Sequence, residues 1–245
     1  MPVQLRVFPD THQLVDSVVT GIIKAIFSEL ETHNRADIVL TGGGVGTAVA
    51  LRLIAAIPQT AVDWSRVNLW WGDERFVPIS SVDRNDVPVV SALAELPPPR
   101  PTLYRVGEPS PELSLSDSAF GYAIDVEKMF AQKSDSPGFT VVLLGLGPDG
   151  HVASIFPGHP SVDSALTCLP VDDSPKPPAH RVSMSLATLS NARHVWILAS
   201  GAEKHDALDK LMTEDIETTD IPARGVRGQE STIVWVDRQA AFGAN

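Results

Sequence analysis

The sequence predicts an α/β fold in which a mainly parallel sheet is flanked by helices. Short apolar runs alternate with amphipathic segments along the chain, and the most apolar run, GFTVVLLGLG at residues 138–147, does not alternate with polar residues. Such a run is typical of a parallel strand buried on both faces. Strands that alternate with helices imply right-handed crossovers. The length of 245 residues suits one large domain or two small ones, and we expect a single α/β domain over residues 1–245.

Periodicity predicts the individual elements. The clearest helix covers residues 10–33, where apolar side chains from Leu14 to Leu30 follow a helical spacing. Residues 46–57 form a second helix, which Pro58 ends. Further helices are expected around residues 85–95, 114–132 and 202–212. Strands are expected at residues 3–8, 36–40, 66–71 and 138–147, as two extended segments within residues 181–201, and before a short helix within residues 231–242. The Pro/Ser-rich stretches at 97–118 and 170–180 are interpreted as loops or a small excursion.

Composition narrows the classes of partner. The chain has 19 basic and 30 acidic residues, a formal net charge of −11, and no basic stripe, which argues against nucleic-acid binding. The single cysteine, Cys168, cannot form an intrachain disulfide, which fits a reducing compartment. We see no signal peptide and no apolar run long enough to span a bilayer. We therefore expect a cytoplasmic protein without a membrane partner. Composition does not fix the oligomeric state, for which we expect a monomer or weak homo-oligomer.

Three loops follow the carboxyl ends of apolar strands, at residues 41–46, 72–85 and 145–158. Open α/β sheets bind their ligands at that edge. The first loop, TGGGVG, lies between a strand and a helix, so its backbone N–H groups could approach an anion at the helix N-terminus. It matches neither GxGxxG nor GxxxxGK[ST]. The alternative is a tight turn that merely needs glycine.

The third loop contains GPDGH, in which Asp149 precedes His151 by two residues. A carboxylate beside an imidazole can orient it and raise its basicity, which suits a general base. The alternative is a histidine on a surface turn. No HExxH motif or cysteine pair indicates a metal site, and no GxSxG motif indicates a nucleophilic serine. Ser154 is interpreted as a helix cap or a packing residue.

The remaining charged candidates are ambiguous. Asp73, Glu74 and Arg75 follow a strand, and from spacing alone a solvated surface loop is favoured over a loop that covers a ligand. Arg181 starts a strand and Lys204 opens a helix near expected strand–loop borders. Either could be ordinary surface charge.

Five segments, taken in order, resemble the glucosamine-6-phosphate isomerase/6-phosphogluconolactonase family. They are LTGGGVGTAVALRL, NLWWGDERFVP with Asn85 downstream, LLGLGPDGHVASIFPGHP, RVSMSLATLSNARHVWILASGAEK, and IPARGV followed by VWVDRQAA. The resemblance implies a Rossmann-like fold shared with sugar-phosphate isomerases and deaminases. It also implies hydrolysis of 6-phospho-D-glucono-1,5-lactone in the oxidative pentose phosphate pathway, with a small sugar-phosphate lactone as the partner and no metal or organic cofactor.

The resemblance further implies roles for individual residues. His151 matches the family histidine taken as general base for the attacking water, and Asp149 is its neighbour in the motif. Arg75 matches the arginine of the loop that closes on substrate. The glycines, Arg181 and Lys204 match the phosphate-binding side. The expected substrate-binding residues are Gly42, Gly43, Gly44, Asp73, Asn85, Arg181 and Lys204.

Two alternatives remain beside the lactonase. A glucosamine-6-phosphate deaminase has a similar GxGxDGH block, but it carries a glutamate before the proline where this chain has Phe156 before Pro157. It also typically has tyrosine at the position of Arg75. Both departures favour the lactonase. A non-catalytic sugar-phosphate sensor could lose the base, and the retention of Asp149 and His151 argues against it.

Overall fold

The computed structural model describes residues 2–132, 138–213 and 215–243. The strands of its main sheet are β1 (Val3–Phe8), β2 (Ala36–Leu40), β3 (Val67–Trp71), β5 (Thr102–Leu103), β6 (Phe139–Gly145), β9 (Ala192–Ala199) and β10 (Ser231–Asp237). The helices are α1 (Thr11–Thr32), α2 (Gly43–Ala56), α3 (Val87–Ala94), α4 (Leu115–Ala131), α5 (Leu186–Ser190), α6 (His205–Met212) and α7 (Arg238–Phe242). No helix in this described part of the chain is both long and apolar enough to cross a bilayer.

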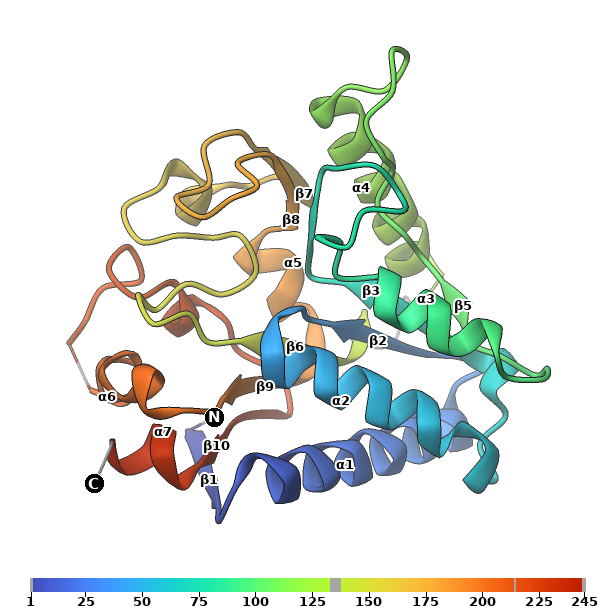
Figure 1. Cartoon of the computed structure of the whole chain (residues 1–245), viewed down its shortest axis with the longest axis horizontal. Helices are drawn as coiled ribbons and strands as arrows, with labels where there is room; N and C mark the ends of the chain where they lie inside the picture. Colours follow the sequence, from blue (N-terminus) through green and yellow to red (C-terminus); the bar gives the residue numbers. More distant parts are fainter. Residues whose placement is uncertain (1, 133–137, 214, 244–245) are drawn as a thin grey trace.

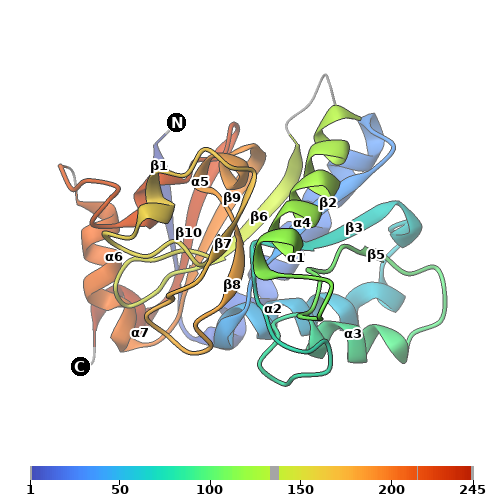
Figure 2. The same ribbon diagram turned by 90° about the horizontal axis from the view of Figure 1, so that it is seen from above.

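The main sheet runs in the order β1-β10-β9-β6-β2-β3-β5, and each neighbouring pair is parallel. Helices cover both of its faces (Figures 1 and 2). The predicted α/β class, with a mainly parallel sheet flanked by helices, is therefore confirmed. The sheet reverses its strand order between β6 and β2, and such a reversal is where α/β proteins open a crevice.

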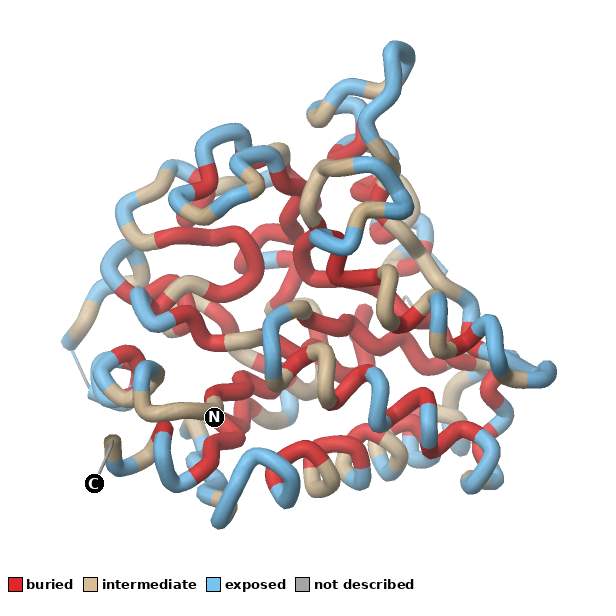
Figure 3. The backbone as a smooth tube through the Cα atoms, viewed as in Figure 1, coloured by how far each residue is buried: buried red, intermediate tan, exposed pale blue. Residues whose placement is uncertain are grey.

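The sheet separates two hydrophobic cores. One core lies under α1, α2 and α3 and includes Trp71, and the other lies against α4 and α6 and includes Trp70. Neighbours on one strand enter opposite cores because successive side chains of a strand point to opposite faces. The central strands are consequently buried along their length, while the outer loops are exposed (Figure 3).

A second sheet was not predicted. It contains β4 (Asp73–Arg75), β8 (Arg181–Met184) and β7 (Cys168–Val171), joined as antiparallel pairs in the order β4-β8-β7. The prediction of a loop over residues 72–85 is therefore wrong for its first residues, and the stretch 170–180 begins within a strand. β4 has three residues, too few for periodicity to reveal. Pro170 lies on β7, an edge strand, where a proline is tolerated.

Smaller differences concern element ends. α2 begins at Gly43, three residues before the expected start, so the glycines themselves form its first turn. The two extended segments expected within residues 181–201 are β8 and β9, with α5 between them. The Pro/Ser-rich stretch at 97–118 contains β5, which pairs with β3 at the edge of the sheet.

Candidate active site

A cavity of about 460 Å³ lies at the carboxyl edge of β2, β3, β6 and β9. All three loops singled out from the sequence contribute to its wall. Of the residues predicted for the site, Asp149 alone does not line the cavity. Those that do are Gly42, Gly43, Gly44, Asp73, Arg75, Asn85, His151, Arg181 and Lys204.

The glycine loop presents the N-terminus of α2 to the cavity. Gly42 caps the helix without a side-chain hydrogen bond, and Gly43 has a φ of +78°. A Cβ added at Gly43 or Gly44 would meet no atom within 4 Å. The first N–H groups of a helix lack intrahelical partners and carry the positive end of its dipole. This open, positively polarised turn fits an anion such as a phosphate.

The turn after β6 holds Asp149 behind His151. Oδ1 of Asp149 accepts a hydrogen bond from Nδ1 of His151, whose ring lines the cavity. Burial alone would raise the pKa of Asp149, but the hydrogen bond from His151 and the charges of His151 and Lys176 hold it well below its ordinary value. The ionised carboxylate keeps the ring proton on Nδ1, so Nε2 is the nitrogen free to accept a proton.

The backbone of this turn is shaped around the pair. A Cβ on Gly147 would lie 1.9 Å from Nδ1 of His151, and the N–H of Gly147 donates to the carbonyl of His151 at 2.9 Å. Gly150 has a φ of +90°, and Ala153, which lines the cavity, has a φ of +49°. A left-handed alanine is unfavourable and tends to persist where function requires the geometry.

Ser154 links this turn to β4. Its hydroxyl donates to Oδ2 of Asp73 at 2.7 Å, and its N–H donates to the hydroxyl of Ser183 at 3.2 Å. Ser154 is fully buried, so the interpretation as a packing residue is confirmed. The interpretation as a helix cap is wrong, because no described helix begins there.

The second sheet supplies the charged wall. Asp73 and Glu74 are 7% and 1% exposed, so the favoured interpretation of a solvated surface loop is wrong. Pairing of β4 with β8 buries them and sets Arg75 opposite Arg181. Nη1 of Arg181 lies 3.8 Å from Oδ2 of Asp73. Within the described residues, Nε of Arg75 is buried without a hydrogen-bond partner, which leaves a donor available beside the cavity.

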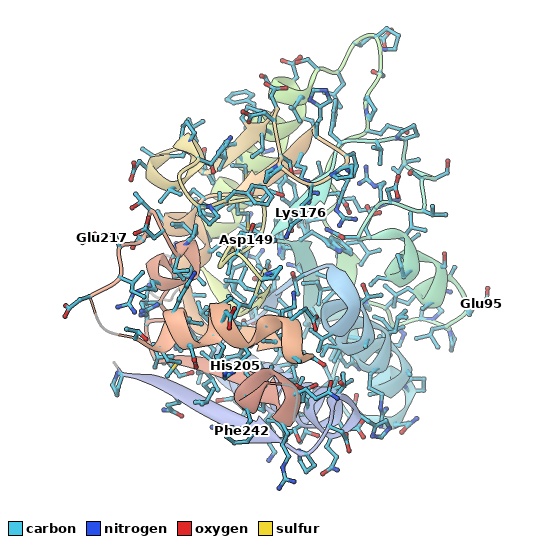
Figure 4. All side chains as sticks on the ribbon, turned by 60° about the vertical axis from the view of Figure 1, so that its left-hand side comes forward. Glu95, Asp149, Lys176, His205, Glu217 and Phe242 are labelled. Atoms are coloured by element: carbon cyan, nitrogen blue, oxygen red, sulfur yellow. The ribbon has the colours of Figure 1, made fainter. Side chains whose placement is uncertain are left out.

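Lys176 is a cavity residue that the sequence did not indicate. Its Nζ lies 3.7 Å from Oδ1 of Asp149 and 3.4 Å from Nδ1 of His151. Figure 4 shows Asp149 and Lys176 close together. Lys176 belongs to the segment between β7 and β8, and a lysine between prolines carries no signal until those strands are known to pair. Other unpredicted lining residues with polar side chains are Thr11, Thr41, Ser200 and Glu203.

Lys204 lies at the end of the short 3-10 turn Ala202–Lys204, immediately before α6, close to its predicted place. Burial lowers the pKa of this lysine. Nearby, the hydroxyls of Thr11 and Ser200 both donate to Oδ2 of Asp237, at 3.1 and 2.6 Å. The protons of these two hydroxyls are engaged with Asp237, so the cations and backbone N–H groups of the cavity wall supply the donors for an anionic ligand. Among the described residues, no group of three His, Cys, Asp or Glu side chains is arranged to hold a metal ion.

Comparison with known proteins finds 6-phosphogluconolactonases that match over nearly the whole chain. The 6-phosphogluconolactonase of Mycobacterium tuberculosis is 36% identical, over 98% of each chain, and that of Streptomyces coelicolor is 34% identical, over 97% of this chain and 93% of the other. The crystal structure of 6-phosphogluconolactonase from Thermotoga maritima has a TM-score of 0.80 at 26% identity, covering 97% of this chain and 100% of that one. The enzyme from Trypanosoma brucei has a TM-score of 0.82 at 25% identity, covering 100% and 99%.

The family model described as glucosamine-6-phosphate isomerases/6-phosphogluconolactonase matches residues 9–235. That span includes every residue predicted for the site. The chain belongs to the glucosamine-6-phosphate isomerase/6-phosphogluconolactonase family.

Proposed function

We propose that this chain hydrolyses 6-phospho-D-glucono-1,5-lactone to 6-phospho-D-gluconate, a step of the oxidative pentose phosphate pathway, with His151 as the general base. The observation that carries the proposal is that His151, hydrogen-bonded to Asp149, lines the same cavity as the open N-terminus of α2. The first can activate water, and the second can bind a phosphate. Full-length similarity to 6-phosphogluconolactonases supports the same substrate.

The reaction needs little beyond these groups. Nε2 of His151 takes a proton from water as the water oxygen bonds to the lactone carbonyl carbon. The tetrahedral intermediate then breaks its bond to the ring oxygen, which takes the proton back from the imidazolium. Asp149 holds the ring orientation and stabilises the imidazolium. General-base catalysis of this kind contributes roughly 10²–10⁴-fold.

Two further tasks fall to the cations. Lys176, whose Nζ lies 3.4 Å from Nδ1 of His151, and Arg75, which lines the same cavity, could stabilise the oxyanion of the intermediate. Arg181 and Lys204, with the N–H groups at Gly43 and Gly44, bind the phosphate in this proposal. Binding the remote phosphate positions the carbonyl against the water, which lowers the entropic part of the barrier.

The deaminase alternative is disfavoured by Phe156. This side chain is 2% exposed, and its ring centroid lies 4.8 Å from that of His151. An apolar ring therefore occupies the position before Pro157, and it has no proton to give to a sugar ring oxygen. We further propose that the protein acts in the cytoplasm as a monomer or weak homo-oligomer, without nucleic acid, since its net charge of −11 opposes that partner.

The test is acid release from freshly generated 6-phosphogluconolactone, measured against the spontaneous rate because this ester also opens unaided. Ammonia release from glucosamine 6-phosphate is measured in parallel. Rapid lactone opening without ammonia is the expected result. Ammonia release without lactone opening would assign the deaminase reaction instead. Tight binding of 6-phosphogluconate with neither reaction would indicate the non-catalytic sugar-phosphate sensor.

A further inference from the structure

Glu74 has no role in the steps above, although it stands between two cavity residues, Asp73 and Arg75. Its side chain does not line the cavity and is 1% exposed. A buried carboxylate is costly unless its oxygens are well satisfied. The hydrogen-bond partners of the Glu74 carboxyl group therefore indicate its role.

The carboxylate binds both ends of one chain segment. Oε1 accepts the N–H of Arg75 at 2.8 Å and the N–H of Asn85 at 2.7 Å, and Oε2 accepts the N–H of Asp86 at 2.9 Å. Residues 76–84 leave the sheet after the first of these positions and return at the second. Glu74 thus joins the two ends of this segment with three hydrogen bonds from backbone N–H groups, which are charge-assisted when the carboxyl group is ionised.

The two joined ends carry two cavity residues. Asn85 donates from Nδ2 to the carbonyl of Asp73 at 3.0 Å, and its Oδ1 lies 1.9 Å from where a Cβ of Gly42 would be. Asn85 therefore abuts the glycine loop, while Nη1 of Arg75 donates to the carbonyl of Asp83 within the same segment. A change in the hydrogen bonds of Glu74 would therefore displace both Arg75 and Asn85, which line the cavity.

Charge compensation beside Glu74 is consistent with this arrangement. Asp86 accepts from Nε and Nη2 of Arg84 at 3.0 and 2.8 Å and from Nε of Arg105 at 2.7 Å. Arg84 is 2% exposed, so this ion pair is also internal. Arg84 and Arg105 thereby neutralise the carboxylate of Asp86. The oxygens of Glu74 accept hydrogen bonds from backbone N–H groups instead. Burial still raises the pKa of Glu74 to about 7.

We propose that Glu74 is a positioning residue of the reaction: its carboxylate fixes Arg75 and Asn85 by binding the backbone at both ends of residues 76–84. The inference rests on the proposed lactonase function for its kinetic consequence. Its structural consequence, protection of three backbone amides, is independent of any activity.

The test is Glu74→Gln, which keeps the shape but replaces one acceptor oxygen with an NH₂ group that opposes a backbone N–H. Glu29→Gln is the matched control, because Glu29 is 3% exposed on α1 and pairs with Arg193 at 2.7 Å, away from the cavity wall. Amide exchange of the ¹⁵N-labelled proteins is followed by NMR, and kcat and KM are measured on the lactone.

The expected result is faster exchange at Asn85 and Asp86, whose N–H groups lose an ionised acceptor, and a loss of about 10–100-fold in kcat/KM for Glu74→Gln, because displacement of a catalytic side chain by about 1 Å can cost about 10²-fold. Glu29→Gln should show neither effect. Unchanged exchange at these amides, or an equal kinetic loss in Glu29→Gln, would overturn the proposal. If wild type does not open the lactone, the proposed function fails and the exchange result alone decides the positioning role.

Glu74→Asp provides a second variant if Glu74→Gln does not fold. It keeps the charge but is shorter by one methylene, so it cannot reach Arg75, Asn85 and Asp86 together. Faster exchange confined to one end of residues 76–84 would support the proposal. Wild-type exchange at both ends, with wild-type kinetics, would overturn it.

Discussion

The two glycine-rich loops of the cavity use glycine for opposite reasons. At Gly43 and Gly44 no atom lies within 4 Å of the missing Cβ, so the absent side chains leave room for something that is not protein. At Gly147 the corresponding space is filled by His151 and Asp149. The first loop is open to a ligand, whereas the second is closed around the protein's own catalytic pair. We therefore expect an alanine substitution to be tolerated by the fold at Gly44 and to displace His151 at Gly147.

The largest effect should come from the closed loop's own histidine. His151→Ala should lower kcat by roughly 10²–10⁴-fold, because general-base catalysis is lost, while 6-phosphogluconate still binds. Steady-state kinetics and calorimetric binding measure the two effects. His180→Ala is the matched control, since His180 pairs with Asp172 at 3.0 Å on an exposed part of the chain. Equal losses in binding and rate would remove His151 from the chemistry.

The next effect tests why the closed loop needs glycine. Gly147→Ala places a Cβ 1.9 Å from Nδ1 of His151, so the ring must move. Misplacement of a catalytic group by about 1 Å can cost about 10²-fold, and we expect a fall in kcat of that order with a smaller change in KM. A variant with wild-type kcat would show that the ring position does not matter.

Glu74 on β4 adds a pH dependence of stability that is opposite in sign to that of Asp149 in the closed loop, because burial raises the pKa of Glu74 whereas the pKa of Asp149 is lowered. Because burial raises the pKa of Glu74 to about 7, the folded protein holds a proton that the unfolded chain has already lost above its ordinary value of 4.5. The contribution of Glu74 to the free energy of unfolding therefore falls as pH rises across this interval and is constant above it.

Urea unfolding of wild type and Glu74→Gln at about pH 5 and about pH 8 isolates this contribution. The glutamine variant should lose less stability between the two values than wild type does. Parallel changes in the two proteins would mean that Glu74 titrates normally.

The smallest effect tests the open loop. Gly44→Ala adds a methyl group to the first turn of α2 without a clash, and alanine favours a helix over glycine by about 0.5–1 kcal/mol. We expect slightly higher stability together with a several-fold higher KM for the phosphorylated lactone, because the methyl group occupies ligand space. A higher melting temperature with unchanged KM would place the phosphate elsewhere.

Periodicity was sufficient for every strand of the main sheet except the two-residue β5, and for the longer helices. The apolar stripe beginning at Leu14 gave α1, and the uninterrupted run at residues 138–147 gave the buried strand β6. The Asp149–His151 pair was also accessible, because both residues lie on one tight turn. The spacing of residues along the sequence thus predicted those features that depend on neighbouring residues, namely single helices, single strands and one tight turn.

Features that depend on the second sheet could not be predicted from the sequence. Asp73 and Glu74 belong to a charged triplet, which by composition indicates a surface, yet pairing of β4 with β8 buries both. Lys176 approaches His151 only because β7 and β8 form a hairpin. Such contacts depend on long-range pairing of strands three and four residues long, which leave no periodic signal.

The central claim is that the two glycine loops hold opposite ends of one substrate. A crystal structure of the wild-type protein with 6-phosphogluconate tests it most directly. The account predicts the phosphate at the N–H groups of Gly43 and Gly44 with Lys204 nearby, and the product carboxylate at Nε2 of His151. The reverse orientation, with the phosphate at His151, would contradict it.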